Sequence, residues 1–96
     1  MAKESKLSLS ENNIVFSKDA LKDYRYWLKT DKKIHAKIND LIDDIIAHPF
    51  VGLGKPEPLR WLLVGCWSRR IDQQHRLVYR INNNKLEIIS CRYHYK

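Results

Sequence analysis

The spacing of apolar residues along the chain changes once, a little after its midpoint. Up to residue 48, apolar side chains recur at intervals of three and four, which is the period of a helix with one buried face. Two such segments, about 18–30 and 32–48, are separated only by a turn near Asp31, so we expect an antiparallel helix hairpin. Ser17 offers an N-cap for the first helix, and Pro49 limits the second. The residues expected to be buried are Leu21, Tyr24, Trp27 and Leu28 in the first helix and Ile34, Ile38, Leu41, Ile42 and Ile45 in the second.

From residue 58 onward the pattern favours strands, because branched and aromatic residues dominate and apolar residues alternate with polar ones. The predicted strands cover 58–65, 66–71, 75–81 and 85–94, and the asparagine run at 82–84 predicts a hairpin turn. A short apolar segment at 13–16 predicts one further strand ahead of the helices. The order of one strand, two helices and a strand meander predicts an α+β fold, with the helices on one face of a mainly antiparallel, twisted sheet and the other face open.

The composition is that of one ordinary globular domain, with 96 residues of which 44% are hydrophobic and 30% charged. We expect residues 1–12 to be a flexible polar extension and residues 13–96 to form the domain. No segment approaches the roughly 18 apolar residues of a membrane span, and the first dozen residues lack the apolar region of a secretory signal, so a cytoplasmic location without membrane contact is expected. Cys66 and Cys91 have no metal-binding spacing and are expected to be buried thiols.

The positive charge is concentrated in the second part of the chain. The formal net charge is +7, and residues 55–96 hold nine Lys and Arg against three Asp and Glu. Six of the seven arginines lie in this part: Arg60, Arg69, Arg70, Arg76, Arg80 and Arg92. The planar guanidinium group suits bidentate contact with phosphate, which favours a nucleic acid as partner over a solvated basic face without a ligand.

Three side chains could carry acid–base chemistry on a phosphate. Glu57 lies in the segment KPEP, where the prolines push Lys55 and Glu57 toward extended backbone and would hold the carboxylate in place. Arg76 alternates with apolar neighbours and should point to the open face of the sheet. His94, near the C-terminus, can carry a proton at neutral pH and release it during a reaction.

Alternation alone does not establish that Arg76 and His94 share a face. If residues 82–85 form a four-residue turn, Ile81 pairs with Leu86, and Arg76 then shares a face with the odd-numbered positions of the last strand. A bulge, or a turn one residue longer or shorter, reverses that parity. Arg69 and Arg70 are adjacent in one strand, so only one of them can share the surface with Arg76.

Five segments in order, FSKDALKDYRYW, TDKKIHAKINDLI, PFVGLGKPEPL, GCWSRRIDQQHRLVYRI and CRYHY, together resemble the YoeB/Txe branch of the RelE/ParE toxin superfamily. The resemblance covers nearly all of the chain from Asn13 to Tyr95. It implies the RelE-like fold, which agrees with the predicted layout. It also implies the toxin of a type II toxin–antitoxin system, an endoribonuclease that cleaves mRNA in the ribosomal A site without a metal or other cofactor.

The resemblance assigns roles to individual residues of this chain. It implies that Glu57 is the general base, Arg76 stabilises the phosphate and His94 is the general acid, and that Tyr95 shapes the site or stacks on a base. The basic and aromatic residues expected to contact RNA are Lys55, Arg60, Arg69, Arg70, Arg92 and Tyr93. The reaction would be attack of a ribose 2′-hydroxyl on the adjacent phosphorus, giving a 2′,3′-cyclic phosphate and a 5′-hydroxyl.

The expected partners are the ribosome with its mRNA, an acidic antitoxin of the YefM/Axe type, and a second copy of the chain in a homodimer. The antitoxin is expected to cover the basic, aromatic face or to displace the C-terminal tail. Two alternatives remain: a ParE-like toxin that inhibits gyrase by binding, and a non-enzymatic module that binds ribosomes or RNA. Trp61, in a predicted strand, is expected in the core, with RNA stacking or a dimer contact as the alternatives.

Overall fold

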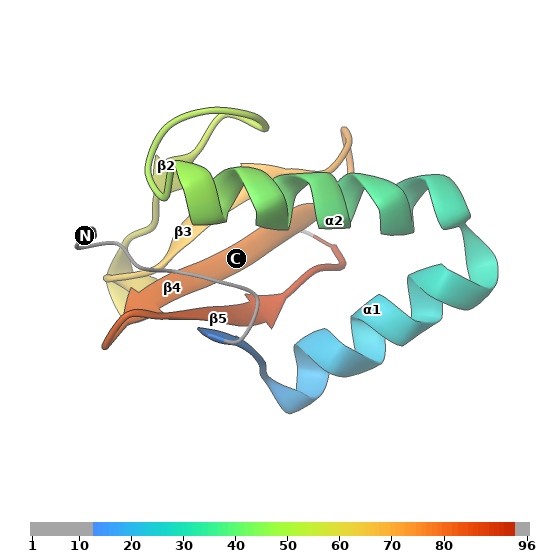
Figure 1. The fold of residues 1–96 in the computed structure, drawn as a ribbon, viewed down its shortest axis with the longest axis horizontal. Helices are drawn as coiled ribbons and strands as arrows, with labels where there is room; N and C mark the ends of the chain where they lie inside the picture. The colour runs from blue at the N-terminus through green and yellow to red at the C-terminus, as the bar shows by residue number, and fades with distance from the viewer. Residues whose placement is uncertain (1–12, 94–96) are drawn as a thin grey trace.

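The computed structural model describes residues 13–93, which form two helices packed on one face of a five-stranded sheet (Figure 1). The elements follow one another as β1 (Ile14–Phe16), α1 (Lys18–Thr30), α2 (Lys32–Ala47), β2 (Glu57–Pro58), the short 3₁₀ helix η2 (Trp61–Leu63), β3 (Trp67–Arg70), β4 (Arg76–Asn82) and β5 (Lys85–Ser90). The order across the sheet is β1-β5-β4-β3-β2, and only the β1–β5 pair is parallel. The predicted α+β layout is therefore confirmed. The expected flexible extension, residues 1–12, lies outside the described residues.

Side-chain caps set the boundaries of the two helices. The Ser17 hydroxyl accepts a hydrogen bond from the Ala20 amide at 3.0 Å, as an N-cap does. Asp31 ends α1 and begins α2, because its backbone N–H donates to the Trp27 carbonyl while its carboxylate accepts from the amides of Lys33 and Ile34. Asp31 is thus the single residue that connects the two helices, and the predicted helix hairpin turns at this residue.

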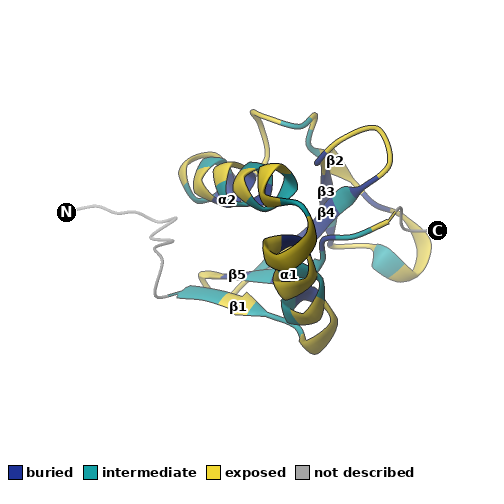
Figure 2. Ribbon diagram, turned by 90° about the vertical axis from the view of Figure 1, so that its right-hand side faces the viewer, coloured by how far each residue is buried: buried dark blue, intermediate teal, exposed yellow. Residues whose placement is uncertain are grey.

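The main core lies between the helices and the sheet, where Figure 2 shows the buried residues between exposed outer faces. The predicted stripe of α2 is confirmed, with Ile38, Leu41 and Ile45 fully buried. In α1 the prediction is correct for Trp27 but wrong for Leu28, which is 49% exposed. Ala20, seven residues before Trp27 and therefore on the same face of the helix, is fully buried, whereas Leu28 lies about a quarter turn around the helix from Trp27.

The β4–β5 hairpin has the predicted turn and, further along, a bulge. Asn83 and Asn84 have φ of 54° and 63°, the left-handed pair that a two-residue hairpin loop requires and that asparagine tolerates well. Ile81 pairs with Leu86, as the four-residue turn predicts. Between Val78 and Tyr79 the register shifts, so that Tyr79 pairs with Ile88 but Val78 pairs with Ser90. As a result, the even-numbered residues of β4 before Tyr79 lie on the same face as even-numbered residues of β5, whereas from Tyr79 onward even-numbered residues of β4 pair with odd-numbered residues of β5.

The segment after β2 is not the strand that the sequence predicts. Only Glu57–Pro58 pair with β3, and the chain then forms η2, followed by a turn at Gly65. Leu59, Cys66 and Val78 form a second, smaller cluster on the sheet face away from the helices, so that face is partly covered. The expectation that Trp61 lies in the core is wrong, since its side chain is 87% exposed. A 3₁₀ turn presents three successive residues to different sides, and here two of them face outward.

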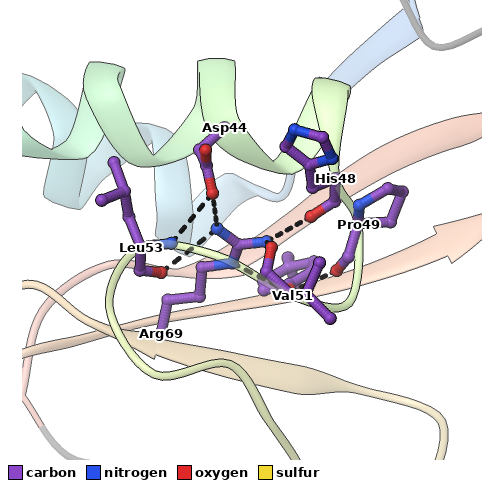
Figure 3. A network of polar contacts seen from close by, with 7 residues as sticks. Asp44, His48, Pro49, Val51, Leu53 and Arg69 are labelled. Carbon is purple, nitrogen blue, oxygen red and sulfur yellow. Dashed lines mark hydrogen bonds and ion pairs between the residues drawn. The ribbon is translucent and has the colours of Figure 1, made fainter.

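Arg69 is the largest fully buried side chain among residues 13–93 and joins β3 to the loop that follows α2 (Figure 3). Its guanidinium forms an ion pair with Asp44 and donates to the carbonyls of His48, Val51 and Leu53. Its Nε donates to the Tyr79 hydroxyl at 3.2 Å, and that hydroxyl donates to the Pro49 carbonyl at 2.7 Å. Phe50, Val51 and Leu53 of this loop are exposed, although the Phe50 ring contacts Trp67 of β3, so the network adds the polar contacts that hold the loop against the sheet.

The Asp44–Arg69 pair should make stability depend on pH in the acid range. The hydrogen bond from Arg69, and then that from the Leu53 amide, lower the pKa of Asp44 below its ordinary value of 3.8. A carboxyl with a depressed folded pKa contributes stability that is present above about pH 4 and lost as the pH falls through the folded value. The stability difference between the native chain and Asp44→Asn, measured by urea unfolding, should therefore shrink below about pH 4. A difference that stays constant down to pH 2 would contradict this account.

Both cysteines are buried as free thiols, as predicted. Burial, and secondarily the nearby Asp23 charge, raise the pKa of the Cys91 thiol to about 12. Neither helix in residues 13–93 combines the length and the apolar character that a bilayer span requires.

Candidate functional site

The structure brings Glu57 and Arg76 together at one end of the sheet. Glu57 is in β2 and Arg76 begins β4, on either side of β3, and their Oε1 and Nη1 atoms lie 3.4 Å apart. The same Nη1 donates to the Ser68 hydroxyl of β3 at 3.4 Å. The Arg76 side chain is 15% exposed and that of Glu57 is 52% exposed. The arginine is therefore mostly buried, in contact with Ser68 of the sheet, while the carboxylate faces solvent.

A tight loop sets the position of Glu57. The Gly54 carbonyl accepts a hydrogen bond from the Arg70 amide at 2.6 Å. A Cβ added at Gly54, where φ is +78°, would lie 2.9 Å from the Arg70 carbonyl oxygen and 3.0 Å from the Arg69 Cβ, so only glycine allows this approach. The expectation of extended backbone at Lys55 is wrong, because its φ is 54°. The chain turns sharply at Gly54 and Lys55 to cross β3, and extended geometry resumes at β2.

The tail after β5 is fastened to α1 although it no longer belongs to the sheet. The Trp27 indole N–H donates to the Cys91 carbonyl at 2.8 Å, and the Cys91 amide donates to the Asp23 carboxylate at 3.1 Å. Burial raises the pKa of Asp23, against the lowering effect of that hydrogen bond. The Arg92 guanidinium lies 3.6 Å from the centre of the Tyr26 ring.

His75 fastens the tail on its other side. The Tyr93 amide donates to His75 Nδ1 at 2.7 Å, and the Arg76 amide donates to the Tyr93 carbonyl at 3.2 Å. The imidazole is buried and meets the Trp27 ring edge-on, with centroids 4.8 Å apart. The backbone of the tail at Tyr93, the last described residue, is therefore hydrogen-bonded to the backbone of Arg76.

His94 and Tyr95 lie outside the described residues, so their predicted roles remain predictions. The β4–β5 bulge places Arg76 in the parity of Ser90, the last residue of β5. The chain leaves the strand after Ser90, and Tyr93 has a φ of 65°, so alternation does not extend to position 94 and the shared face of Arg76 and His94 remains a prediction.

Removal of the His75 acceptor should loosen the tail. In His75→Leu the Tyr93 amide loses its partner, and a hydrogen bond of this kind contributes about 1 kcal/mol. We expect amide hydrogen exchange at Tyr93, followed by NMR, to become about fivefold faster, since 1.4 kcal/mol corresponds to tenfold. His48→Leu, at an exposed histidine, is the control and should leave Tyr93 unchanged. Equal exchange rates in the native chain and His75→Leu would show that the contact does not hold the tail.

Comparisons with known proteins agree with the sequence resemblance. Residues 16–95 match the family described as YoeB-like toxin of bacterial type II toxin-antitoxin system. The toxin YoeB of Escherichia coli K12 is 52% identical over 82 residues, which cover 85% of this chain and 98% of the relative. The chain belongs to the YoeB-like toxins.

Two solved structures of Staphylococcus aureus proteins extend the likeness to the fold. A YoeB–YefM complex gives a TM-score of 0.81 at 46% identity, covering 86% of this chain and 97% of that one. A YoeB dimer gives a TM-score of 0.83 at 46% identity, covering 92% of this chain and 99% of that one. The predicted RelE-like fold is confirmed by these neighbours.

In this YoeB-like toxin the residues expected to contact RNA separate into two groups. Lys55, Arg60, Arg70 and Tyr93 are exposed, and Arg70 lies directly opposite Arg76 in the β3–β4 register. Arg69 is fully buried in the network with Asp44, so its assignment as an RNA contact is wrong. Its side chain points to the helix side of the sheet because strand neighbours alternate. Arg92 is half-buried and stacks on Tyr26, which makes it part of the tail anchor.

Two residues of the site were not found from the sequence. A serine in a strand carries no chemical signal of its own, yet Ser68 is fully buried and accepts a hydrogen bond from Arg76. His75 stands at the start of a predicted strand, and that position alone indicates no function. Its place one residue before Arg76 was the available signal, since a residue in that position can reach whatever segment approaches the arginine.

Proposed function

We propose that this YoeB-like toxin is a ribosome-dependent endoribonuclease that cleaves mRNA in the A site. The observation that carries the proposal is the meeting of the Glu57 carboxylate and the Arg76 guanidinium on a basic end of the sheet. A carboxylate and a cation at this distance supply a proton acceptor and a charge for a phosphate. The strongly basic second part of the chain supports RNA as the substrate class.

In the proposed reaction the enzyme accepts one proton from the RNA and donates one proton to it. Glu57 takes the proton of a ribose 2′-hydroxyl, and the oxygen attacks the adjacent phosphorus. The bond from phosphorus to the 5′-oxygen breaks, and His94 donates a proton to the departing oxygen. The products are a 2′,3′-cyclic phosphate and a 5′-hydroxyl, and no water is consumed in this step.

Arg76 stabilises the negative charge that grows on the non-bridging phosphate oxygens. Its side chain is mostly buried and rests on Ser68, so it is oriented before the substrate arrives. Preorganised charge of this kind is often the largest single contribution to catalysis. Because the contact with Glu57 is long at 3.4 Å, a phosphate can compete for the same guanidinium and leave the carboxylate free to act as base.

The ribosome supplies the orientation that two or three side chains on an open surface do not. Fixing the 2′-oxygen in line with the scissile bond can remove roughly 7 to 11 kcal/mol of the barrier. Acid–base assistance adds only about 10²- to 10⁴-fold. We therefore propose that free RNA is a poor substrate, that Tyr95 and the exposed basic residues position the mRNA, and that the reaction takes place in the cytoplasm.

An antitoxin and a second copy of the chain are the proposed protein partners. A related toxin has been solved in complex with YefM, and another as a dimer. For this chain we propose an acidic antitoxin of the YefM type, which would neutralise the basic surface around Arg76. We propose a homodimer as the state of the toxin between these encounters.

The test is cleavage in a purified translation system, with cut sites read by primer extension. The native chain should cut translated mRNA and leave the same mRNA uncut without ribosomes. Glu57→Gln should cut at least 10²-fold more slowly, while Asp40→Asn, an exposed carboxylate on α2, should match the native rate. Undiminished cutting by Glu57→Gln would remove the proposed base. Inhibition of gyrase supercoiling with intact mRNA would establish the ParE-like alternative instead, and ribosome binding without cut ends would establish a binding module.

A further inference from the structure

An open pocket beside Arg76 has a strong excess of positive charge. It has a volume of about 580 Å³ and is lined by Lys37, Gly54, Lys55, Arg70, Ile71, Asp72, Gln73 and Arg76. Lys37 belongs to α2, Lys55 to the loop before β2, and Arg70 and Arg76 to the paired ends of β3 and β4. Three separate parts of the fold thus deliver cations to one concavity.

Most of this positive charge has no partner within the described part of the chain. Arg76 contacts Glu57, but no ion pair is formed by Lys37, Lys55 or Arg70 among residues 13–93. The one carboxylate in the lining, Asp72, accepts hydrogen bonds from the amides of Gln74 and His75 at 2.8 and 2.7 Å. The Asp72 carboxylate is therefore already engaged by the backbone of the turn between β3 and β4.

The register of the sheet adds to the crowding of charge. Arg70 and Arg76 are direct cross-strand partners, and like charges in such a pair destabilise a sheet. An anion between or beside them would turn this repulsion into attraction. Since neighbouring apolar or oppositely charged residues would serve a purely structural role better, the pair indicates a site for a negatively charged ligand.

We propose that this pocket binds a backbone phosphate of the RNA next to the scissile one, and that Lys37 contacts that phosphate from α2. The proposal rests on the proposed function, because the pocket shares Arg76 with the site of cleavage. The flanking phosphate lies in the pocket while the scissile phosphate lies against Arg76 and Glu57. Lys37 holds the substrate in register and takes no part in the chemical step.

The test measures binding of an RNA pentanucleotide that cannot be cleaved, because one 2′-deoxy sugar replaces the attacking hydroxyl. Fluorescence anisotropy over a range of salt concentrations gives the affinity and its salt dependence. In Lys37→Gln the affinity should fall about three- to tenfold, and the slope of log K against log salt should decrease by about 0.7 for the lost contact with a single strand. Lys85→Gln is the matched control, because Lys85 is exposed at the start of β5, paired with the end of β4 that lies away from Arg76, and should change the affinity less than twofold.

A second arm locates the phosphate. Neutral methylphosphonate linkages are placed one at a time beside the deoxy position. One of them should weaken binding to the native chain about as much as Lys37→Gln does, and it should weaken binding to Lys37→Gln hardly further, because the same contact is already lost. Equal losses in the native chain and the variant at every linkage would overturn the subsite, as would equal affinities of Lys37→Gln and Lys85→Gln or a native chain that does not bind the oligonucleotide.

The outcomes separate this inference from the proposed function. Binding that depends on Lys37, without any cleavage on ribosomes, would leave the phosphate subsite standing and remove the nuclease. Cleavage on ribosomes that depends on Glu57, with binding indifferent to Lys37, would do the reverse. Thermal unfolding should be the same for Lys37→Gln and the native chain, since Lys37 makes no ion pair among the described residues.

Discussion

Replacement of Arg69 by methionine is expected to lower the free energy of unfolding by about 3–5 kcal/mol, because it removes a fully buried guanidinium, the partner of the partly exposed Asp44 carboxylate, and leaves several hydrogen-bond acceptors unpaired. The change also leaves the carbonyls of His48, Val51 and Leu53 without their donor (Figure 3). Domains of this size have total stabilities of about 5–15 kcal/mol, so the expected loss is a large fraction of the total.

The adjacent arginine provides the control for this prediction. Arg70→Met changes an exposed side chain in the same strand and should alter stability by no more than about 0.5 kcal/mol. Urea unfolding followed by circular dichroism measures both variants. Equal effects would mean that the network around Arg69 does not hold the loop against the sheet, and that the loop is placed by other contacts.

Replacement of Arg76 by alanine is expected to lower mRNA cleavage on ribosomes by about 10²- to 10³-fold, the typical effect of removing one preorganised charge from a transition state. Arg76→Lys should recover only part of the loss, because a lysine ammonium cannot contact a phosphate in the bidentate manner of a guanidinium.

Arg80 is the matched control in the same strand. It lies four residues further along β4 than Arg76, and its Nη2 pairs with the Glu87 carboxylate at 2.6 Å. Arg80→Ala should therefore reduce cleavage no more than about twofold, through a small loss of general attraction for RNA. Comparable losses in Arg76→Ala and Arg80→Ala would show that the arginines act only through overall charge.

The periodic parts of the fold could be predicted from the sequence because each follows one local rule. The stripe of α2 and the alternation in β4 are long enough to define a face, and Ser17 and the asparagine turn carry their own signals. The segment at 61–64 follows no such rule. An apolar run of four residues has no distinct period, and the turn that exposes Trp61 depends on how Leu59 and Cys66 pack against Val78.

The candidate site could be predicted only as far as its residue types. Which of Arg69 and Arg70 is exposed depends on the position of α2, because Asp44 on that helix forms the ion pair with the buried Arg69. Whether Arg76 and the C-terminal tail meet depends on the bulge at Val78, which leaves no clear mark in the alternation. His75 and Trp27 then hold the tail, and that contact joins residues far apart in the chain.

The most direct test of the nuclease is the chemistry of the RNA ends. Messenger RNA fragments from ribosomes treated with the purified toxin can be analysed by mass spectrometry. The proposed roles of Glu57 and Arg76 predict upstream fragments that end in a 2′,3′-cyclic phosphate and downstream fragments that begin with a 5′-hydroxyl, both absent when Glu57 is replaced by glutamine. Fragments with a 3′-hydroxyl and a 5′-phosphate, or intact mRNA at toxin concentrations that stop translation, would contradict it.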